Sequence, residues 1–300
     1  MKCDQIEVNS LSEYIELVND SKPSRGNNIK IFRGSASVDY DYKPGVGRRV
    51  NESMHNNVSI FENRMIQKAK LKMPEIFIGD KYPVQTLTKL QHYGLPTRLL
   101  DFTTNALVAL MFACESKTVD KTKKNGKVIL YHEKEDNIYS CYSPFVNAIA
   151  EMNAISNLTV SDFNDYVKHL ETKDFWVFSD YDKTNIDKII QRVDKPIFFE
   201  TELNSERIKR QQGLFLIFPN KISGNNNTRI IEEDIVSWEF SQALELIIQD
   251  NYKKRIKREL SAFGITKSFL FPEPENICRD IFEEVKDGIE RLAKQSDSND

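Results

Sequence analysis

The sequence predicts an α+β fold, and three observations support this expectation. Short apolar runs typical of buried strands stand at residues 29–32, 196–200 and 213–218. Segments with apolar residues at helical spacing lie between and around these runs. The composition of the 300 residues, 40% hydrophobic and 29% charged, is that of a folded protein and excludes a disordered or collagen-like chain.

The first elements follow from local patterns. Residues 10–19 predict a helix, because apolar side chains recur at helical spacing behind Ser10, a good N-cap residue. Residues 29–32 (IKIF) predict a short buried strand, and residues 35–57, which have no sustained period, predict a loop. Residues 58–73 have one apolar face and predict a helix that ends before a proline.

The middle of the chain combines turns with a fully apolar helix. Residues 85–93 predict a helix, and Gly94 suits the left-handed position just beyond its end. Residues 96–101 predict an extended turn. Residues 106–114 lack a polar face, which indicates a buried helix, and residues 117–127 predict a lysine-rich loop.

The remaining elements are predicted from the same patterns. Strands are expected at residues 128–132, 196–200, 213–218, 230–238 and 244–248. Helices are expected in the polar stretch 134–190, at 252–263 and at 277–292, with a disordered tail at 295–300. No repeat and no linker between domains is evident.

Charge and cysteine content describe the protein's setting more than its function. The formal charge of −3 gives no global basic field, so a nucleic-acid site would have to be a local patch. No apolar run reaches the length of a membrane span, and no signal peptide is evident. The four cysteines are scattered without CxxC spacing and the four histidines lie far apart, which favours a cytoplasmic protein with reduced thiols and no metal site.

Three segments depart from ordinary globular sequence. The first is Arg33-Gly34 at the end of a predicted strand, where a glycine lets the backbone approach a ligand and an arginine fork suits a phosphate or carboxylate. A partly buried arginine that binds a neighbouring loop is the alternative.

The second segment, residues 90–113 (LQHYGLPTRLLDFTTNALVALMFA), concentrates polar groups ahead of the apolar helix. Backbone N–H groups at a helix start favour an anion there. The alternative is that Thr104 or Asn105 only caps the helix while Arg98 pairs with Asp101.

The third segment, residues 207–219 (RIKRQQGLFLIFP), places Gln211 and Gln212 directly before a predicted buried strand. A buried glutamine needs partners for both its carbonyl and its amide, either from the backbone or from a ligand. Two loop glutamines outside the sheet are the alternative.

These segments, in this order, closely resemble the FRG domain family, which is named after the Phe-Arg-Gly tripeptide found here at residues 32–34. The segment KKRIKRELSAFGITKSFLFP resembles the end of many members. The resemblance implies a single FRG-type domain over residues 1–300, with a core at about 25–220 and C-terminal strands and helices at about 228–294.

The segment order also resembles that of ADP-ribosyltransferases, which implies a split, curved sheet with flanking helices and a cleft between the strands of Arg33 and Gln212. The implied catalytic residues are Arg33, Thr103 (or Thr104) and Gln212, with Gln211 as the second choice for the last position. Glutamine carries no full charge there, and Glu202 and Glu206 are nearby candidates to supply one.

The same resemblance implies a site for NAD as a substrate. The residues implied to bind NAD are Arg33, Gly34, His92, Tyr93, Thr104 and Phe112, with the Tyr93 ring stacked on nicotinamide. The implied activity is transfer of ADP-ribose to RNA or protein by a toxin or phage-defence effector, which an antitoxin or other regulatory partner would restrain.

Two other functions remain open at this point. The scaffold is alternatively a non-catalytic module that binds a nucleotide or nucleic acid, or an interaction protein in which the same residues are structural. Basic segments at residues 253–258 and 117–127 are candidate nucleic-acid surfaces, but they contain few aromatic side chains for base stacking and are more typical of solvated faces.

Overall fold

The computed structural model describes residues 4–22, 27–48, 62–152, 161–173, 192–203, 205–224, 230–240, 243–274 and 276–278. These residues form an α+β fold built on a large mixed sheet, as the sequence predicts. The strands are β1 (Asp4–Val8), β2 (Asn28–Ser35), β3 (Leu99–Thr103), β4 (Thr118–Val119), β5 (Thr122–Lys123), β6 (Gly126–Lys134), β7 (Ile138–Ser140), β8 (Ser161–Asp162), β9 (Ile197–Glu200), β10 (Gly213–Ile217), β11 (Asn220–Ser223), β12 (Ile230–Ile235) and β13 (Leu244–Ile248). The α-helices are α1 (Leu11–Asp20), α2 (Glu62–Lys72), α3 (Pro83–His92), α4 (Ala106–Ala113), α5 (Pro144–Glu151), α6 (Phe163–Glu171), α8 (Glu206–Gln211), α9 (Asp250–Ala262) and α10 (Lys267–Leu270). Short 3₁₀ turns lie at η1 (Gly45–Gly47), η3 (Pro74–Phe77) and η4 (Glu135–Asn137).

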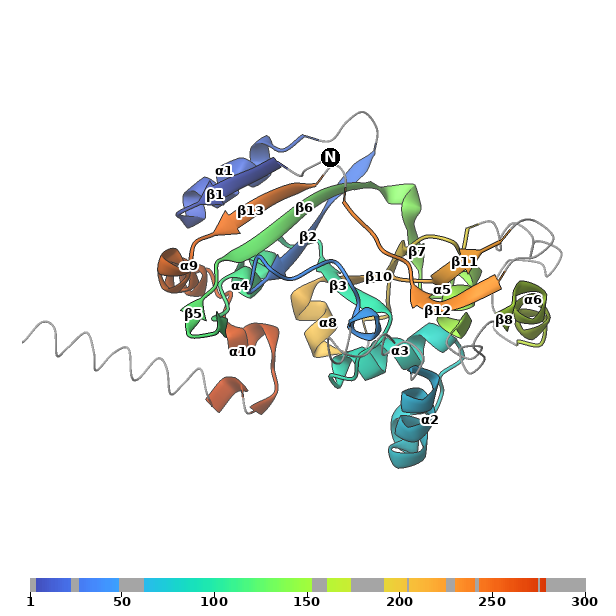
Figure 1. The fold of residues 1–300 in the computed structure, drawn as a ribbon. Helices are drawn as coiled ribbons and strands as arrows, with labels where there is room; N and C mark the ends of the chain where they lie inside the picture. Colours follow the sequence, from blue (N-terminus) through green and yellow to red (C-terminus); the bar gives the residue numbers. More distant parts are fainter. Residues whose placement is uncertain are drawn as a thin grey trace, which may run out of the picture.

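Eight strands form the main sheet in the order β1-β13-β6-β2-β3-β10-β9-β7. The two outer pairs, β1 with β13 and β7 with β9, are parallel, whereas the pairs between them are antiparallel. Figure 1 shows β13, β6 and β2 running side by side on one half of the molecule, and β3, β10 and β7 on the other. The sheet therefore joins strands from near both ends of the described chain.

Helices cover one face of this sheet in two separate groups. An apolar cluster that includes Val108, Leu130 and Ile256 holds α4, α9 and α1 against the half made by β2, β6 and β13. A second cluster, which includes Leu87 and Phe199, holds α3, α5 and α6 against the half made by β3, β9 and β10. The helices thus pack on two halves of one sheet (Figure 1).

The opposite face of the sheet is packed with a third apolar cluster. Successive side chains in a strand point to opposite faces, so Ile31 and Ile129 lie here while their neighbours contact α4. Rings of Phe102, Phe198 and Phe240 meet in this cluster, with edge-on contact between the first two at 5.1 Å between ring centres. Both faces of the central strands are buried, which explains their continuous apolar runs.

Several predicted elements are confirmed with small shifts of their ends. The helix α1 begins after Ser10, whose hydroxyl accepts a hydrogen bond from the Glu13 N–H at 3.2 Å. Gly94 follows α3 with a φ of 83°, in the left-handed region that glycine tolerates. The apolar helix α4 begins after Asn105, whose side chain accepts from the Leu107 N–H at 3.0 Å.

The prediction of an extended turn over residues 96–101 is wrong in part, because β3 begins at Leu99 and pairs along its whole length with β10. The strand β1 and the helix α8 were not expected from the sequence patterns. The predicted loop at 117–127 contains the small hairpin of β4 and β5. Parts of the predicted helices at 58–73, 134–190 and 277–292, together with the tail at 295–300, lie outside the described residues.

Candidate functional site

The main sheet opens between its two central strands. β2 and β3 share one pair of opposed residues, Phe32 and Thr103. In an antiparallel ladder the next pair would join Arg33 to Phe102, yet this pair is missing from the ladder that the described strands form. A cavity of about 240 Å³ lies at this opening, with both Arg33 and Phe102 in its wall.

We call this space the split cavity and define it by its lining. Its polar and glycine residues are Arg33, Gly34, Gln91, His92, Asp101, Thr103, Arg207, Gln211 and Gly213. Its apolar residues are Phe32, Phe102, Phe112, Ile208, Leu214 and Phe215. Strands β2, β3 and β10 and helices α3, α4 and α8 all contribute, so segments far apart in the sequence converge here.

Arg33 crosses the opening between the strands. Its Nη1 donates a hydrogen bond to the backbone carbonyl of Asp101 at 2.6 Å, and its guanidinium lies 5.9 Å from the ring centre of Phe102. Burial lowers the pKa of Arg33 to about 10, an effect that the nearby negative charge of Asp101 opposes. The side chain therefore stays cationic at neutral pH, and a guanidinium has five N–H donors, so one bond to a carbonyl leaves others for an anion.

Gly34 has a packing role that the sequence interpretation did not include. A Cβ on Gly34 would lie 1.8 Å from the carbonyl oxygen of Ala109 and 2.8 Å from the Cβ of Phe112. Helix α4 therefore sits directly on the backbone of β2, where only glycine leaves room. Gly34 also lines the split cavity, so the close approach that it allows is to a helix at the cavity wall.

Asp101 brings a carboxylate to the split cavity. Asp101 is the only acidic side chain among the described residues that line the cavity. Its Oδ2 accepts a hydrogen bond from Gln91 Nε2 at 3.0 Å, and Gln91 Oε1 accepts in turn from the Thr97 hydroxyl at 2.7 Å. Because the Thr97 hydroxyl fixes the Gln91 side chain, the Gln91 amide in turn orients the Asp101 carboxylate, although Asp101 is exposed.

Thr103 links the second sequence segment to the third. Its hydroxyl donates to the backbone carbonyl of Gln211 at 2.7 Å and accepts from the Asn105 N–H at 2.9 Å. Gln211 lines the split cavity, and its side-chain Nε2 donates to the carbonyl of Leu270 at 3.0 Å. Thr103 and Gln211 are therefore brought together with Arg33.

Gln212 and Thr104 lie apart from this cavity. Gln212 ends helix α8 in a left-handed conformation with φ 45° and ψ 50°, and its side chain is exposed. The Thr104 N–H donates to the Gln212 carbonyl at 3.2 Å, and the Thr104 side chain is exposed. Neither residue lines the split cavity. Of the two candidate pairs, it is Gln211 and Thr103 that line it.

His92 and Arg207 form the cavity wall between α3 and α8. Arg207 Nη1 approaches the His92 carbonyl at 3.5 Å, and the guanidinium of Arg207 lies 4.4 Å from the ring centre of Phe271. Burial, with the positive charge of Arg207, lowers the pKa of His92 below its usual value. Burial also lowers the pKa of Arg207, against the opposing effects of Glu273 and Asp101.

The sequence alone does not single out Arg207 or Gln91, and for Asp101 it suggests only a pairing with Arg98. The signal for Arg207 was present, because Arg207 and Gln211 are four residues apart and so share one face of α8. Of the residues that the resemblance implies to bind NAD, Phe112 lines the split cavity, whereas Tyr93 does not and is 62% exposed. Glu202 and Glu206 are not in its lining either: the first binds Gln85 and Tyr142, and the second pairs with Lys209.

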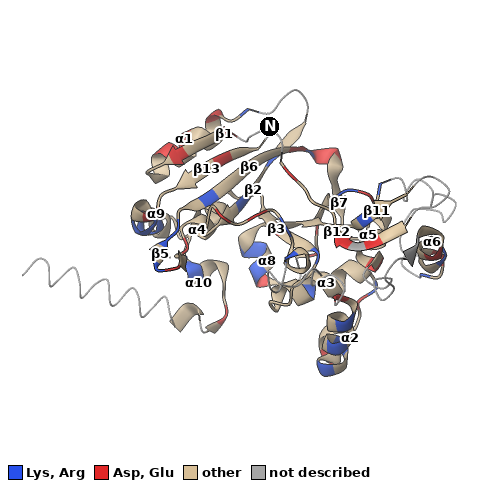
Figure 2. Cartoon of the chain, viewed as in Figure 1, with Lys and Arg blue, Asp and Glu red and all other residues tan. Residues whose placement is uncertain are grey.

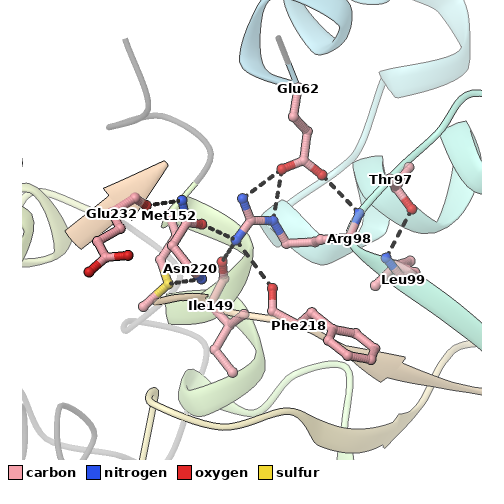
Figure 3. A network of polar contacts seen from close by, with 9 residues as sticks. All are labelled: Glu62, Thr97, Arg98, Leu99, Ile149, Met152, Phe218, Asn220 and Glu232. Atoms are coloured by element: carbon pink, nitrogen blue, oxygen red, sulfur yellow. Dashed lines mark hydrogen bonds and ion pairs between the residues drawn. The ribbon is translucent and has the colours of Figure 1, made fainter. Parts of the chain in front are cut away.

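Arg98, considered above as a partner for Asp101, lies instead in the protein core. Its Nη2 donates to Glu62 at 2.6 Å, and its Nη1 donates to the Ile149 carbonyl at 3.1 Å and to Asn220 Oδ1 at 3.0 Å. Figure 3 shows this network, in which the guanidinium joins α2, α5 and β11. Arg98 is fully buried and its role is structural.

The two predicted basic surfaces are largely occupied by internal contacts. In the 253–258 segment, Lys253 is buried and donates to the carbonyls of Ala36 and Glu115, while Arg255 binds Glu259 at 2.8 Å. In the 117–127 segment, three lysines form ion pairs: Lys123 with Asp250, Lys124 with Asp39 and Lys127 with Glu245. Figure 2 shows Lys and Arg on α2, α8 and α9, which are separate parts of the described structure.

Within the described part of the chain, no helix is long and apolar enough to cross a membrane, and no three His, Cys, Asp or Glu side chains are grouped to hold a metal ion.

Comparison with known proteins identifies one family. No curated protein and no solved structure matches the sequence. The family model of the FRG domain matches residues 28–122, which include Arg33, Gly34, Asp101 and Thr103, and the predicted family resemblance is thereby confirmed over these residues.

Proposed function

From the premise that residues 28–122 form an FRG domain, we propose that the protein is an NAD-dependent ADP-ribosyltransferase that uses the split cavity to transfer ADP-ribose to RNA or protein. The observation that carries this proposal is the convergence of Arg33, Asp101 and Gln211 in one cavity at the opening of the sheet. A transferase of this kind would act as a toxin or defence effector under the control of a partner.

Two arginines give the cavity its affinity for a dinucleotide. Arg33 and Arg207 both line it, and planar guanidinium groups bind phosphate oxygens through parallel hydrogen bonds. The half-buried positions of both side chains limit screening by water, which strengthens their interaction with a bound anion. The apolar walls, with Phe112 and Phe215, suit a flat ring such as nicotinamide.

Asp101 supplies the charge that a glutamine lacks. When the bond between nicotinamide and the ribose C1′ breaks, its electron pair goes to the nicotinamide ring and the sugar is left with positive charge. A carboxylate held near that sugar stabilises the charge in the transition state. Gln91 fixes the Asp101 carboxylate in the cavity, and Gln211 is placed to orient a sugar hydroxyl. The acceptor then bonds to C1′ and releases its proton to the solvent.

A non-catalytic nucleotide-binding module is the second candidate. Gln211 favours it, because its amide already donates to the Leu270 carbonyl and a glutamine side chain carries no charge. In that case Arg33 and Arg207 would bind phosphate and no bond would be broken.

The test is transfer of label from NAD to total RNA or to cell lysate. We expect label transfer by the wild-type protein and a loss of roughly a hundredfold in rate for Asp101→Asn, the scale seen when one electrostatic partner of a transition state is removed. Arg33→Ala should lose transfer and any toxicity on expression. Arg255→Ala, which removes an exposed arginine on α9, is the matched control and should behave as wild type.

The outcomes separate the two candidates. Binding of NAD without label transfer by the wild-type protein would support the non-catalytic module. Absence of both binding and transfer would contradict a nucleotide site in the split cavity.

A further inference from the structure

A second cavity adjoins the split cavity on the other side of His92. It has a volume of about 340 Å³ and lies between one side of α3 and the segment that leads into α8. Its lining includes Thr88, Lys89, Tyr93, Thr201 and Ser205. We call it the Tyr93 cavity.

The two cavities share part of their walls. His92 and Ile208 line both of them. On the side of the Tyr93 cavity, His92 Nε2 lies 3.3 Å from the Ser205 hydroxyl, and on the other side the Arg207 guanidinium approaches the His92 carbonyl. His92 therefore stands at the boundary between the two cavities, with the Arg207 cation beside it.

The volume of the split cavity limits what it can hold. Ligand pockets for molecules of drug size occupy about 300–1,000 Å³, and a dinucleotide lies toward the large end of that size range. At about 240 Å³, the split cavity is smaller than this range. A bound dinucleotide must therefore extend beyond it.

The chemistry of the two cavities follows the order of groups in a dinucleotide. The split cavity has a carboxylate and an amide for a reacting ribose, Arg207 lies at the boundary for phosphates, and the Tyr93 cavity has hydroxyls and an aromatic ring. The ring of Tyr93 is 62% exposed, which leaves it open to stack on a base. The side chain of Lys89 is occupied by Asp80 at 2.5 Å, so its charge is balanced.

We propose that the Tyr93 cavity is the adenosine subsite of the NAD site, with adenine stacked on Tyr93 and the pyrophosphate passing His92 beside Arg207. This inference rests on the proposed function. It also changes the expected role of Tyr93, since the resemblance implied stacking on nicotinamide and Tyr93 lies outside the cavity that holds the reacting ribose.

The test compares binding of NAD and of its two halves, nicotinamide mononucleotide and AMP, by titration calorimetry. The variants are Tyr93→Ala and Tyr93→Phe, with Phe263→Ala as a control because Phe263 is similarly exposed, at 67%, and follows α9. We expect Tyr93→Ala to weaken NAD and AMP by roughly tenfold, the effect of one stacked base, and to leave nicotinamide mononucleotide unchanged. Tyr93→Phe and Phe263→Ala should bind all three as wild type does.

Three results would overturn the inference, and they can be told apart. If the wild-type protein binds NAD and Tyr93→Ala binds it equally well, the adenosine lies elsewhere while the proposed function stands. If Tyr93→Ala keeps NAD binding but loses label transfer, the Tyr93 cavity holds the acceptor. If the wild-type protein does not bind NAD, both this inference and the proposed function fail.

Discussion

Arg98 and Arg33 are both on the FRG-matched part of the chain, yet the fold uses them in opposite ways. Arg98 is fully buried, and its hydrogen bonds go to Glu62 and to groups on two other elements. Arg33 is half-buried at the opening of the sheet and has its Nη1 on a single backbone carbonyl. The difference teaches that an arginine in a motif is structural when buried partners satisfy its hydrogen-bond donors, and available to a ligand when it lines a cavity with donors to spare.

The largest effect is expected from breaking the core pair. Glu62→Gln leaves the Arg98 cation buried without its carboxylate, which should lower the free energy of unfolding by about 3–5 kcal/mol. Urea unfolding followed by circular dichroism measures this change. Arg255→Ala, on an exposed pair with Glu259, should change it by less than about 1 kcal/mol. Equal effects of the two substitutions would show that burial does not distinguish these pairs.

The glycine of the Phe-Arg-Gly tripeptide is expected to have the next largest effect. Gly34→Ala drives a Cβ against the Ala109 carbonyl, and the displacement of α4 should cost about 1–3 kcal/mol in free energy of unfolding. Gly213→Ala is the matched control at the same cavity, since the nearest atoms to its Cβ would be 4.0 Å away. A Gly34→Ala protein as stable as Gly213→Ala would contradict the packing role.

The adjacent glutamines sharpen the comparison within the site. Gln211→Ala should weaken NAD binding by roughly fivefold, because a hydrogen bond to a ligand contributes about 0.5–1.5 kcal/mol, whereas Gln212→Ala should have no effect. Titration of NAD into each variant measures both. Loss of binding in Gln212→Ala alone would restore the residue that the sequence resemblance implied.

The smallest effect is expected from His92 and concerns pH. Burial and Arg207 lower its pKa in the folded chain, so the unfolded chain takes up a proton first as the pH falls below about 6.5. The stability contributed by neutral His92 is therefore present above that pH and is lost as the pH falls through the folded-state pKa. His92→Gln should reduce the difference in free energy of unfolding between pH 7.5 and pH 5.5. A larger difference between the two pH values in the variant would contradict a lowered pKa of His92 in the folded chain.

Local patterns predicted the elements whose signals are local. The apolar run of α4, the Ser10 cap of α1 and the glycine after α3 all act within a few residues, and the structure agrees with them. β1 was missed because its partner β13 lies about 240 residues further along the chain, and its own exposed pattern is weak. β3 was missed because a strand of five residues directly after a proline turn is defined by its pairing with β10.

The candidate site was predictable in its residue types and less so in its partners. The segments containing Arg33 and Thr103 were identified from the chain, but the choice between Gln211 and Gln212 depends on which of them ends α8 in a left-handed conformation. The sequence leaves open a pairing of Arg98 with Asp101, three residues away, whereas in the core Arg98 pairs with Glu62 from α2. Because Arg98 pairs with Glu62, the Asp101 carboxylate does not pair with Arg98 and lines the split cavity instead. Only the tertiary packing shows this arrangement.

The most direct test of the account is the affinity of Arg33→Ala for NAD, measured by calorimetry on protein whose melting temperature matches that of wild type. The Arg33 guanidinium donates a hydrogen bond to the Asp101 carbonyl and lies near the Phe102 ring, so its loss should cost only about 1 kcal/mol in stability. We predict binding of NAD by the wild-type protein and at least tenfold weaker binding by Arg33→Ala. Equal affinity of the two proteins, or no binding by either, would contradict a nucleotide site at the opening between β2 and β3.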